Sequence, residues 1–251
     1  MSIVYPQAAP EREQELALNY QGVLQQVENL SKEHNIKSSI TLVAVSKLKP
    51  SSDIMALYKA GVRHFGENYV QELITKSQEL PQDINWHFIG GLQSGKAKDL
   101  AKGVRSLYAV ETIDALKKVK QLDRVRGEVE GSVINVYLQI NTSEEEQKSG
   151  YSLSDLKDIN ETIEFILSDE CKNVKLLGLM TIGSFQESTA EGEENQDFKK
   201  LVTLKNTLDE KYNINLGLSM GMSSDYAQAI KQGSTNVRVG TSIFGVRPPR
   251  T

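Results

Sequence analysis

One repeated pattern constrains this chain more than any other feature. Short apolar runs alternate with longer amphipathic stretches, and the alternation passes through eight cycles. The short runs are rich in Val, Ile and Leu, which predicts strands that are buried on both faces. Strands separated by helices pair in parallel through crossover connections. The predicted strands cover 41–45, 62–65, 86–89, 106–110, 133–140, 176–182, 215–218 and 235–239.

The stretches between these runs carry apolar residues at spacings of three and four, which predicts helices. They cover 52–60, 69–79, 95–101, 113–126, 154–167, 195–212 and 224–232. A further helix is predicted before the first strand, over 11–35, and its recurring apolar residues are Leu16, Tyr20, Val23, Leu24, Val27 and Leu30. Residues 1–10 contain two prolines and are predicted to form a loose terminus.

Eight parallel strands with helices between them are typical of a (β/α)8 (TIM) barrel, in which the sheet closes on itself. An open doubly wound sheet is the alternative. The count of eight and the short stretch of chain after the last strand favour the barrel. We therefore predict an α/β fold in which residues 1–251 form one barrel domain with an extra N-terminal helix. The polar segments 141–150 and 184–194 are expected to be surface loops.

Charge and cysteine content argue against several classes of protein. The chain has 29 basic and 33 acidic residues, whereas nucleic-acid binders usually carry a basic excess. No apolar run approaches the ~20 residues of a membrane span, and the N-terminus lacks the basic start and apolar core of a secretory signal. The single cysteine, Cys171, suits a reducing compartment. We therefore expect a cytoplasmic protein with no nucleic-acid or membrane partner.

In such a barrel, reactive groups lie at the carboxyl ends of the strands. Lys47 follows the first strand, where a desolvated lysine can attack a carbonyl and form a Schiff base. A solvated surface lysine is the alternative. Glu67 and Asn68 follow the second strand. They would orient a ligand or a neighbouring lysine, unless Asn68 merely caps the helix that starts at Tyr69.

Small and hydroxyl residues follow the seventh and eighth strands, where these barrels often bind phosphate. Glycine lets the backbone approach an anion, and hydroxyls add donors; the candidates are Ser219, Ser223, Gly240 and Thr241. Two tight turns with serine caps would look the same. A lysine opposite a phosphate site suits pyridoxal 5′-phosphate (PLP) or the sugar phosphate of a Schiff-base aldolase. His87 has no ligand partner at metal spacing, so we expect no zinc site.

Six motifs, in this order, resemble those of the YggS/PROSC family of PLP-binding proteins, and most of all its fungal members. They are AVSK at 44–47, HFGENYVQE at 64–72, WHFIG with LQ at 86–93, GLMTI at 178–182, LSMGMS at 218–223 and RVGTSIFG at 238–245. The resemblance implies a fold like the barrel domain of bacterial alanine racemase. It also implies that Lys47 carries PLP as a Schiff base, and we expect Asn68 among the cofactor-binding residues.

The resemblance further implies that Ser219, Ser223, Gly240 and Thr241 surround the phosphate. It places Arg238 near the pyridine nitrogen; because an arginine keeps its proton, that nitrogen would stay unprotonated and the ring would be a weak electron sink. A structural ion pair is the rival role. Gly95 departs from the family, which usually has Asn, Lys or Arg there. Two further lysines have two interpretations each: Lys148 is a second docking lysine or a loop residue, and Lys49 is a solvated or an anion-steering lysine.

Family members are regarded as PLP carriers or regulators of vitamin B6 homeostasis. They lack the second domain and the second acid/base group of a two-base racemase. We therefore expect a monomeric PLP-binding protein that buffers PLP or delivers it to apo PLP-dependent enzymes, and that is not primarily an enzyme. The alternative is a weak PLP-dependent amino-acid racemase or lyase, and a sugar-phosphate aldolase is a third option.

Overall fold

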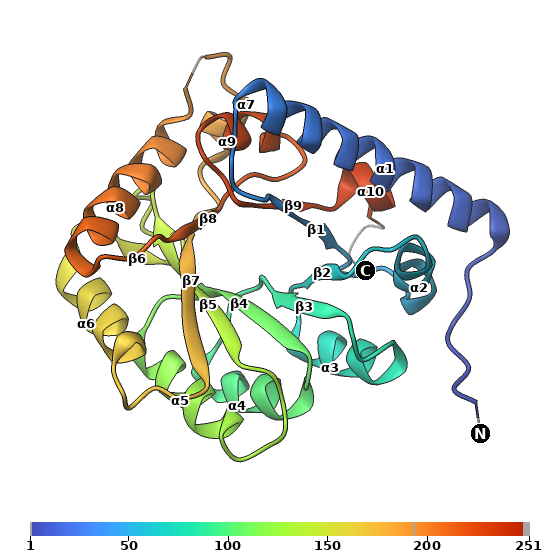
Figure 1. Ribbon diagram of the computed structural model, residues 1–251, viewed down its shortest axis with the longest axis horizontal. Coiled ribbons are helices and arrows are strands. Elements are labelled where there is room, and N and C mark those ends of the chain that lie inside the picture. The colour runs from blue at the N-terminus through green and yellow to red at the C-terminus, as the bar shows by residue number, and fades with distance from the viewer. Residues whose placement is uncertain (1, 193, 248–251) are drawn as a thin grey trace.

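The computed structural model describes residues 2–192 and 194–247. Its centre is a closed ring of eight parallel strands (Figure 1). β9 pairs with β1, with Leu42 opposite Val237, and β4 pairs with β5, with Val110 opposite Val136. The strands of the ring are β1 (Thr41–Val45), β2 (His64–Glu67), β3 (Asn85–Phe88), β4 (Leu107–Ile113), β5 (Ile134–Asn141), β7 (Val174–Met180), β8 (Gly217–Ser219) and β9 (Asn236–Val239). The predicted barrel is therefore confirmed.

Helices cover the outside of the ring (Figure 1). They are α1 (Pro10–Glu33), α2 (Ser51–Lys59), α3 (Val70–Glu79), α4 (Ser94–Gly103), α5 (Leu116–Arg126), α6 (Leu156–Leu167), α7 (Phe185–Thr189), α8 (Gln196–Tyr212), α9 (Tyr226–Lys231) and α10 (Thr241–Phe244). In the described part of the chain, none of these helices is both long and apolar enough to cross a bilayer.

The extra N-terminal helix α1 lies across α2, α9 and α10 (Figure 1). Pro10 occupies its first turn, where proline suits a helix start, and Leu16, Val23 and Val27 are buried beneath it. Arg12 donates to Asp53 of α2 at 2.8 Å and to the carbonyl oxygen of Phe244 at 2.8 Å. Helix α1 thereby fixes α10, which follows the last strand, against the barrel.

Several predicted boundaries are wrong for identifiable reasons. The strand predicted from residue 62 begins at His64, because the Val62 amide closes the end of α2 by donating to Leu57. The helix predicted over 113–126 begins at Leu116, because Ile113 is buried in β4 opposite Leu138 of β5. A two-residue strand, β6 (Tyr151–Ser152), pairs with the end of β5.

The predicted loop 184–194 contains helix α7, of five residues. The Ser184 side chain accepts a hydrogen bond from the Glu187 amide, which caps that helix. A serine three residues before a glutamate is a capping signal that a polar, acidic segment conceals. Residue 193, in the same predicted loop, lies outside the described residues, as does residue 1 of the predicted loose terminus.

The apolar core lies between the strands and the helices, with Phe65, Trp86 and Phe88 among its largest buried side chains. Inside the ring, by contrast, polar groups are buried, notably His87, Glu111, Ser219, Asn236 and Arg238. Buried polar groups need hydrogen-bonding partners. The ring interior therefore holds a polar network directly beneath the end of the barrel where the strands finish.

Candidate functional site

The carboxyl ends of the strands enclose a cavity of about 470 Å³. Its lining residues come from the ends of β1, β2, β3, β7, β8 and β9 with the turns that follow them, and from the segment after α10. Six of the seven residues predicted to bind a cofactor line it, although they come from distant parts of the chain: Lys47, Asn68, Ser223, Arg238, Gly240 and Thr241. The structure therefore brings together almost all of the predicted site.

The charge of this cavity has one sign. Its charged lining residues, within the described chain, are Lys47, Arg238 and Arg247, and all three are basic. Arg247 was missed at the sequence level, because only the fold brings the segment after α10 back over the strand ends. A basic cavity with no carboxylate among its described lining residues favours an anionic ligand.

Because Gly240 has no side chain, the guanidinium of Arg247 can approach its backbone closely. A Cβ at this position would lie 2.8 Å from Nη2 of Arg247 and 3.3 Å from the carbonyl oxygen of Val45. A larger residue would therefore fill the space between the ends of β1 and β9. Ser223 and Thr241 line the same side of the cavity and offer hydroxyl donors.

Lys47 lies on a tight turn directly after β1. The Ser46 amide donates to the carbonyl oxygen of Gly66 in β2, at 2.9 Å. The Lys49 amide donates to the carbonyl oxygen of Ser46, at 3.1 Å, which closes the turn. Leu48 adopts a left-handed conformation with φ of 61°, which is uncommon for a residue other than glycine. The Lys47 side chain is half-buried and lines the cavity, so the fully solvated alternative is not what the fold provides.

Asn68 does not cap α3. The N-cap position of that helix is Tyr69, and no side chain makes a capping hydrogen bond there. The Oδ1 atom of Asn68 is buried without a hydrogen-bond partner, although buried polar atoms normally have one. Because Asn68 lines the cavity, an orphaned side-chain oxygen there favours the ligand-binding interpretation over the capping one.

Arg238 lines the cavity and also makes the structural ion pair considered for it, whereas its place near a pyridine nitrogen stays a prediction. Its guanidinium is buried, lines the cavity, and donates to the Ser219 hydroxyl and, at 3.0 Å, to the carbonyl oxygen of Thr181. It also lies 3.8 Å from Oε1 of Glu111, which forms an ion pair. Burial removes water from Arg238, and this lowers its pKa from the ordinary value despite the nearby carboxylate.

Ser219 is fully buried between Glu111 and Arg238, and its hydroxyl donates to Glu111. The structure does not place it among the described residues that line the cavity. Side chains alternate along a strand, and Ser219 is the last residue of β8, whereas Ser223 lies in the turn beyond it. Ser219 thus accepts a hydrogen bond from Arg238 inside the ring. The contact of Ser219 with a phosphate stays a prediction.

Glu111 is the centre of the network inside the ring. Its Oε2 accepts from His87 at 2.7 Å and from Asn236 at 2.9 Å. Burial alone would raise the pKa of Glu111, but the hydrogen bonds and the charge of Arg238 lower it overall. His87 also bonds His64 at 2.8 Å, where burial and the neighbouring ring lower the pKa of His64 to about 4. His87 is thus a hydrogen-bonded interior histidine.

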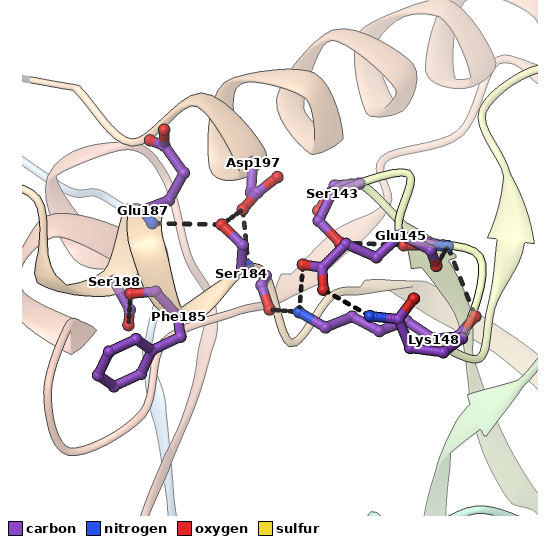
Figure 2. Close-up of polar contacts among 12 residues, drawn as sticks. Ser143, Glu145, Lys148, Ser184, Phe185, Glu187, Ser188 and Asp197 are labelled. Atoms are coloured by element: carbon purple, nitrogen blue, oxygen red, sulfur yellow. Dashed lines mark hydrogen bonds and ion pairs between the residues drawn. The ribbon is translucent and has the colours of Figure 1, made fainter.

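Lys148 lies beside a second cavity, of about 230 Å³, which shares Asn68, Ile89 and Ile182 with the first. Figure 2 shows its side chain reaching from the loop after β5 to the loop before α7. Nζ donates to the carbonyl oxygen of Gly183 at 2.9 Å and pairs with Glu145 at 2.9 Å. In the structure this lysine therefore ties two loops together.

Lys49 and Gly95, the remaining two residues singled out from the sequence, lie outside the described lining of the main cavity. Lys49 donates to the carbonyl oxygen of Val246 at 3.2 Å, and burial together with Arg12 lowers its pKa. Gly95 lies in the first turn of α4, with open space where a Cβ would be. A side chain at position 95 would therefore fit without moving the backbone.

Comparisons with known proteins agree with this geometry. Residues 24–248 match the family model described as alanine racemase, N-terminal domain. The pyridoxal phosphate homeostasis protein of Schizosaccharomyces pombe is 47% identical over 210 residues, which cover 84% of this chain and 85% of that protein. The chain belongs to the pyridoxal phosphate homeostasis protein family. The human family member is 43% identical over 219 residues, which cover 82% of this chain and 76% of that protein.

Solved structures share the fold of this chain. The structure of PipY from Synechococcus elongatus PCC7942 with PLP bound has 34% identity and a TM-score of 0.69, and covers 88% of this chain and all of that one. Alanine racemase of Clostridium difficile 630 shares the fold, with a TM-score of 0.70 at 15% identity over 94% of this chain and 58% of the racemase. The resemblance drawn from the motifs is thereby confirmed.

Proposed function

We propose that this chain binds PLP in the basic cavity and holds it reversibly on Lys47. The observation that carries the proposal is the joint presence of a half-buried lysine and a purely basic set of charged lining residues. PLP carries an aldehyde, which a lysine amine attacks, and a phosphate, which basic groups and hydroxyls bind. Condensation of Nζ with the aldehyde carbon releases one water, and addition of water reverses it.

The residues present fit such a ligand. Arg247, Ser223 and Thr241 supply phosphate donors around Gly240, at the position where a Cβ would fill the available space. Arg238 lines the cavity and would offer its remaining donors to the pyridine nitrogen, since two of its N–H groups are used by Ser219 and Thr181 in the described chain. An arginine that keeps its proton would leave the pyridine nitrogen unprotonated.

The proposed biological role is PLP homeostasis: buffering the cofactor and handing it to apo PLP-dependent enzymes. Relatives named pyridoxal phosphate homeostasis protein support this role. A carrier needs a bond that forms and breaks readily, and a cavity open at the end of the barrel supplies access. We infer one domain that acts as a monomer in the cytoplasm, because α1 packs on the barrel and the single cysteine suits a reducing compartment.

A visible absorption spectrum tests the proposal. Wild-type protein with PLP is expected to develop a yellow band that borohydride bleaches, with PLP then fixed covalently to the peptide that contains Lys47. Lys47→Ala is expected to lack the band, whereas Lys49→Ala, a neighbouring lysine outside the described cavity lining, keeps it. A wild-type protein that stays colourless with PLP would refute the assignment. Transfer to an apo-enzyme no faster than spontaneous release would contradict delivery.

One observation supports a second candidate, a weak racemase or lyase that acts on a small amino acid. The second cavity adjoins the first and has the polar side chains of Gln139, Asn141 and Thr142 in its wall, so an amino acid would fit beside PLP. Against it, Lys47 is the one amine among the described lining residues of the main cavity, and a two-base racemase needs a group on each face. Exchange of α-hydrogen for deuterium that disappears in Lys47→Ala would favour the enzyme.

A further inference from the structure

Both neighbours of Lys47 are held by one cluster of charged side chains. The carbonyl oxygen of Ser46 accepts from Nζ of Lys76 at 2.9 Å, and the Ser46 hydroxyl donates to Oε1 of Glu67 at 2.8 Å. On the other side, the amide of Leu48 donates to Oε1 of Glu72 at 2.7 Å. Residues on either side of Lys47 are therefore fixed by contacts to β2 and α3 rather than by the sheet alone.

The three charged residues are also bonded to one another. Nζ of Lys76 lies 2.6 Å from Oε1 of Glu67 and 2.6 Å from Oε1 of Glu72. The side chains of Lys76 and Glu67 are only 7% and 0% exposed. Taking charges out of water is costly, and apolar residues of similar size often stabilise a fold as well as a buried ion pair does. Stability alone is therefore a poor reason for charges at this place.

The turn that they hold is also a strained one. Leu48 has φ of 61°, and a left-handed residue other than glycine persists only where surrounding contacts enforce it. The bond from its amide to Glu72 is such a contact. Through the shared Oε1 of Glu72, this bond is linked to Lys76 and from there to Ser46. The backbone before and after Lys47 is thus closed into one hydrogen-bonded loop.

We propose that Lys76, Glu67 and Glu72 form a positioning clamp that presets the Lys47 turn for attack on the aldehyde of PLP. The clamp rests on the function proposed above and deepens it. It acts on the backbone of Ser46 and Leu48, so its effect should be confined to the bond that Lys47 makes. Holding a reactant in place raises the effective concentration of the attacking group. The proposed phosphate and ring contacts come from the turns after β8 and β9, from Arg238 and from Arg247, and no hydrogen bond of the described residues links them to the clamp.

Comparison of two ligands isolates that effect. Pyridoxine 5′-phosphate keeps the ring and phosphate of PLP but has an alcohol in place of the aldehyde, so it forms no bond to lysine. The double variant Glu67→Gln with Lys76→Met removes both buried charges and the donor to Ser46, which avoids leaving one buried charge alone. Glu72→Ala removes the acceptor for the Leu48 amide. Dissociation constants for both ligands, and the rate of formation of the yellow band, are measured for each variant.

We expect both clamp variants to bind PLP about ten-fold more weakly and to form the band more slowly, the order of one lost charge-assisted hydrogen bond. Binding of pyridoxine 5′-phosphate should stay within about two-fold of wild type, because phosphate and ring contacts lie elsewhere. The matched control is Glu79→Gln on the same helix, whose carboxylate bonds Ser51 at 2.7 Å and contacts neither neighbour of Lys47. It should bind both ligands like wild type.

Two outcomes would overturn the clamp. Equally weaker binding of PLP and of pyridoxine 5′-phosphate would show that the cluster has only a general structural role. Unchanged PLP binding in folded variants would show that the cluster has no role in binding. Circular dichroism and thermal melting establish that the variants are folded, and Glu72→Ala provides a milder case should the double variant unfold, because Glu72 is partly exposed. Failure of wild-type protein to bond PLP at all would instead contradict the proposed function.

Discussion

Two walls of the cavity each contain a buried cation with a buried carboxylate, but they use these charges differently. On the lysine wall, formed by β1, β2 and α3, Lys76 is buried with Glu67 and bonds backbone beside Lys47 without being among the described cavity-lining residues. On the arginine wall, formed by β4, β8 and β9, Arg238 pairs with Glu111 and itself lines the cavity. In the proposed function, one wall orders the lysine that attacks PLP, and the other presents a fixed positive charge.

The two carboxylates differ because their surroundings differ. Glu111 accepts hydrogen bonds at both oxygens, which lowers its pKa overall. Glu67 has an Oε2 atom with no hydrogen-bond partner, and burial outweighs the charge of Lys76 and raises its pKa to about 7. The arginine wall is thus built to stay charged at all physiological pH values, whereas the lysine wall contains a group that changes charge near neutrality.

The most severe way to break the arginine wall is to remove its carboxylate. Glu111→Ala leaves the Arg238 charge buried without its partner, which costs about 3–5 kcal/mol of the free energy of unfolding. Urea denaturation measures the loss. The control is Asp123→Asn, which removes a buried carboxylate of α5 that does not line the cavity. As long as it is folded, this variant should bind PLP like wild type. Unchanged stability of Glu111→Ala would contradict the assigned network.

The lysine wall should reveal its titrating carboxylate in the pH dependence of stability. The pKa of Glu67 is raised to about 7 in the folded chain, above the ~4.3 of an exposed glutamate. Its contribution is therefore fully present below about pH 4.3 and is lost as the pH rises through 7, on the order of 3 kcal/mol in total. Thermal melts of wild type and Glu67→Gln should diverge across this window. Parallel pH profiles would show that Glu67 does not titrate there.

Loss of phosphate donors should weaken binding of both ligands equally, in contrast to the clamp variants. Ser223→Ala with Thr241→Val removes two hydroxyls from the cavity wall. Each hydrogen bond to a charged group contributes about 1.5–3 kcal/mol, so we expect at least a ten-fold rise in both dissociation constants. Fluorescence titration with PLP and pyridoxine 5′-phosphate gives the values. A loss confined to PLP would move these hydroxyls to the aldehyde side of the site.

A smaller effect is expected where the two walls meet. Gly240→Ala introduces a Cβ 2.8 Å from Nη2 of Arg247 and 3.3 Å from the Val45 carbonyl oxygen. The arginine side chain is flexible and can move aside. We therefore expect the dissociation constant for pyridoxine 5′-phosphate to rise by only about two- to five-fold, less than the effect of losing a hydrogen bond. Calorimetric titration with pyridoxine 5′-phosphate measures it. Tighter binding in the variant would contradict the close approach of Arg247 to the ligand.

Periodicity was enough to predict the barrel, because alternating strand and helix patterns leave few ways to bury both faces of a parallel sheet. It also placed Lys47 and Thr241 at the end of the barrel where the cavity lies, since strand ends converge there, while their contacts with a cofactor stay predictions. It could not separate Ser219 from Ser223, because the side that each serine faces depends on where β8 ends. Arg247 and Lys76 were missed, because their roles depend on tertiary contacts. The i,i+4 spacing of Glu72 and Lys76 was the one local signal of the clamp.

We propose that Lys47 supplies the aldehyde-specific part of PLP binding, while the arginine wall holds the ring and the phosphate. Titration of wild type and Lys47→Ala with PLP and with pyridoxine 5′-phosphate tests it most directly. We expect that wild type prefers PLP strongly and that Lys47→Ala binds both ligands with the same affinity, close to that of wild type for pyridoxine 5′-phosphate. A Lys47→Ala protein that still prefers PLP would contradict it.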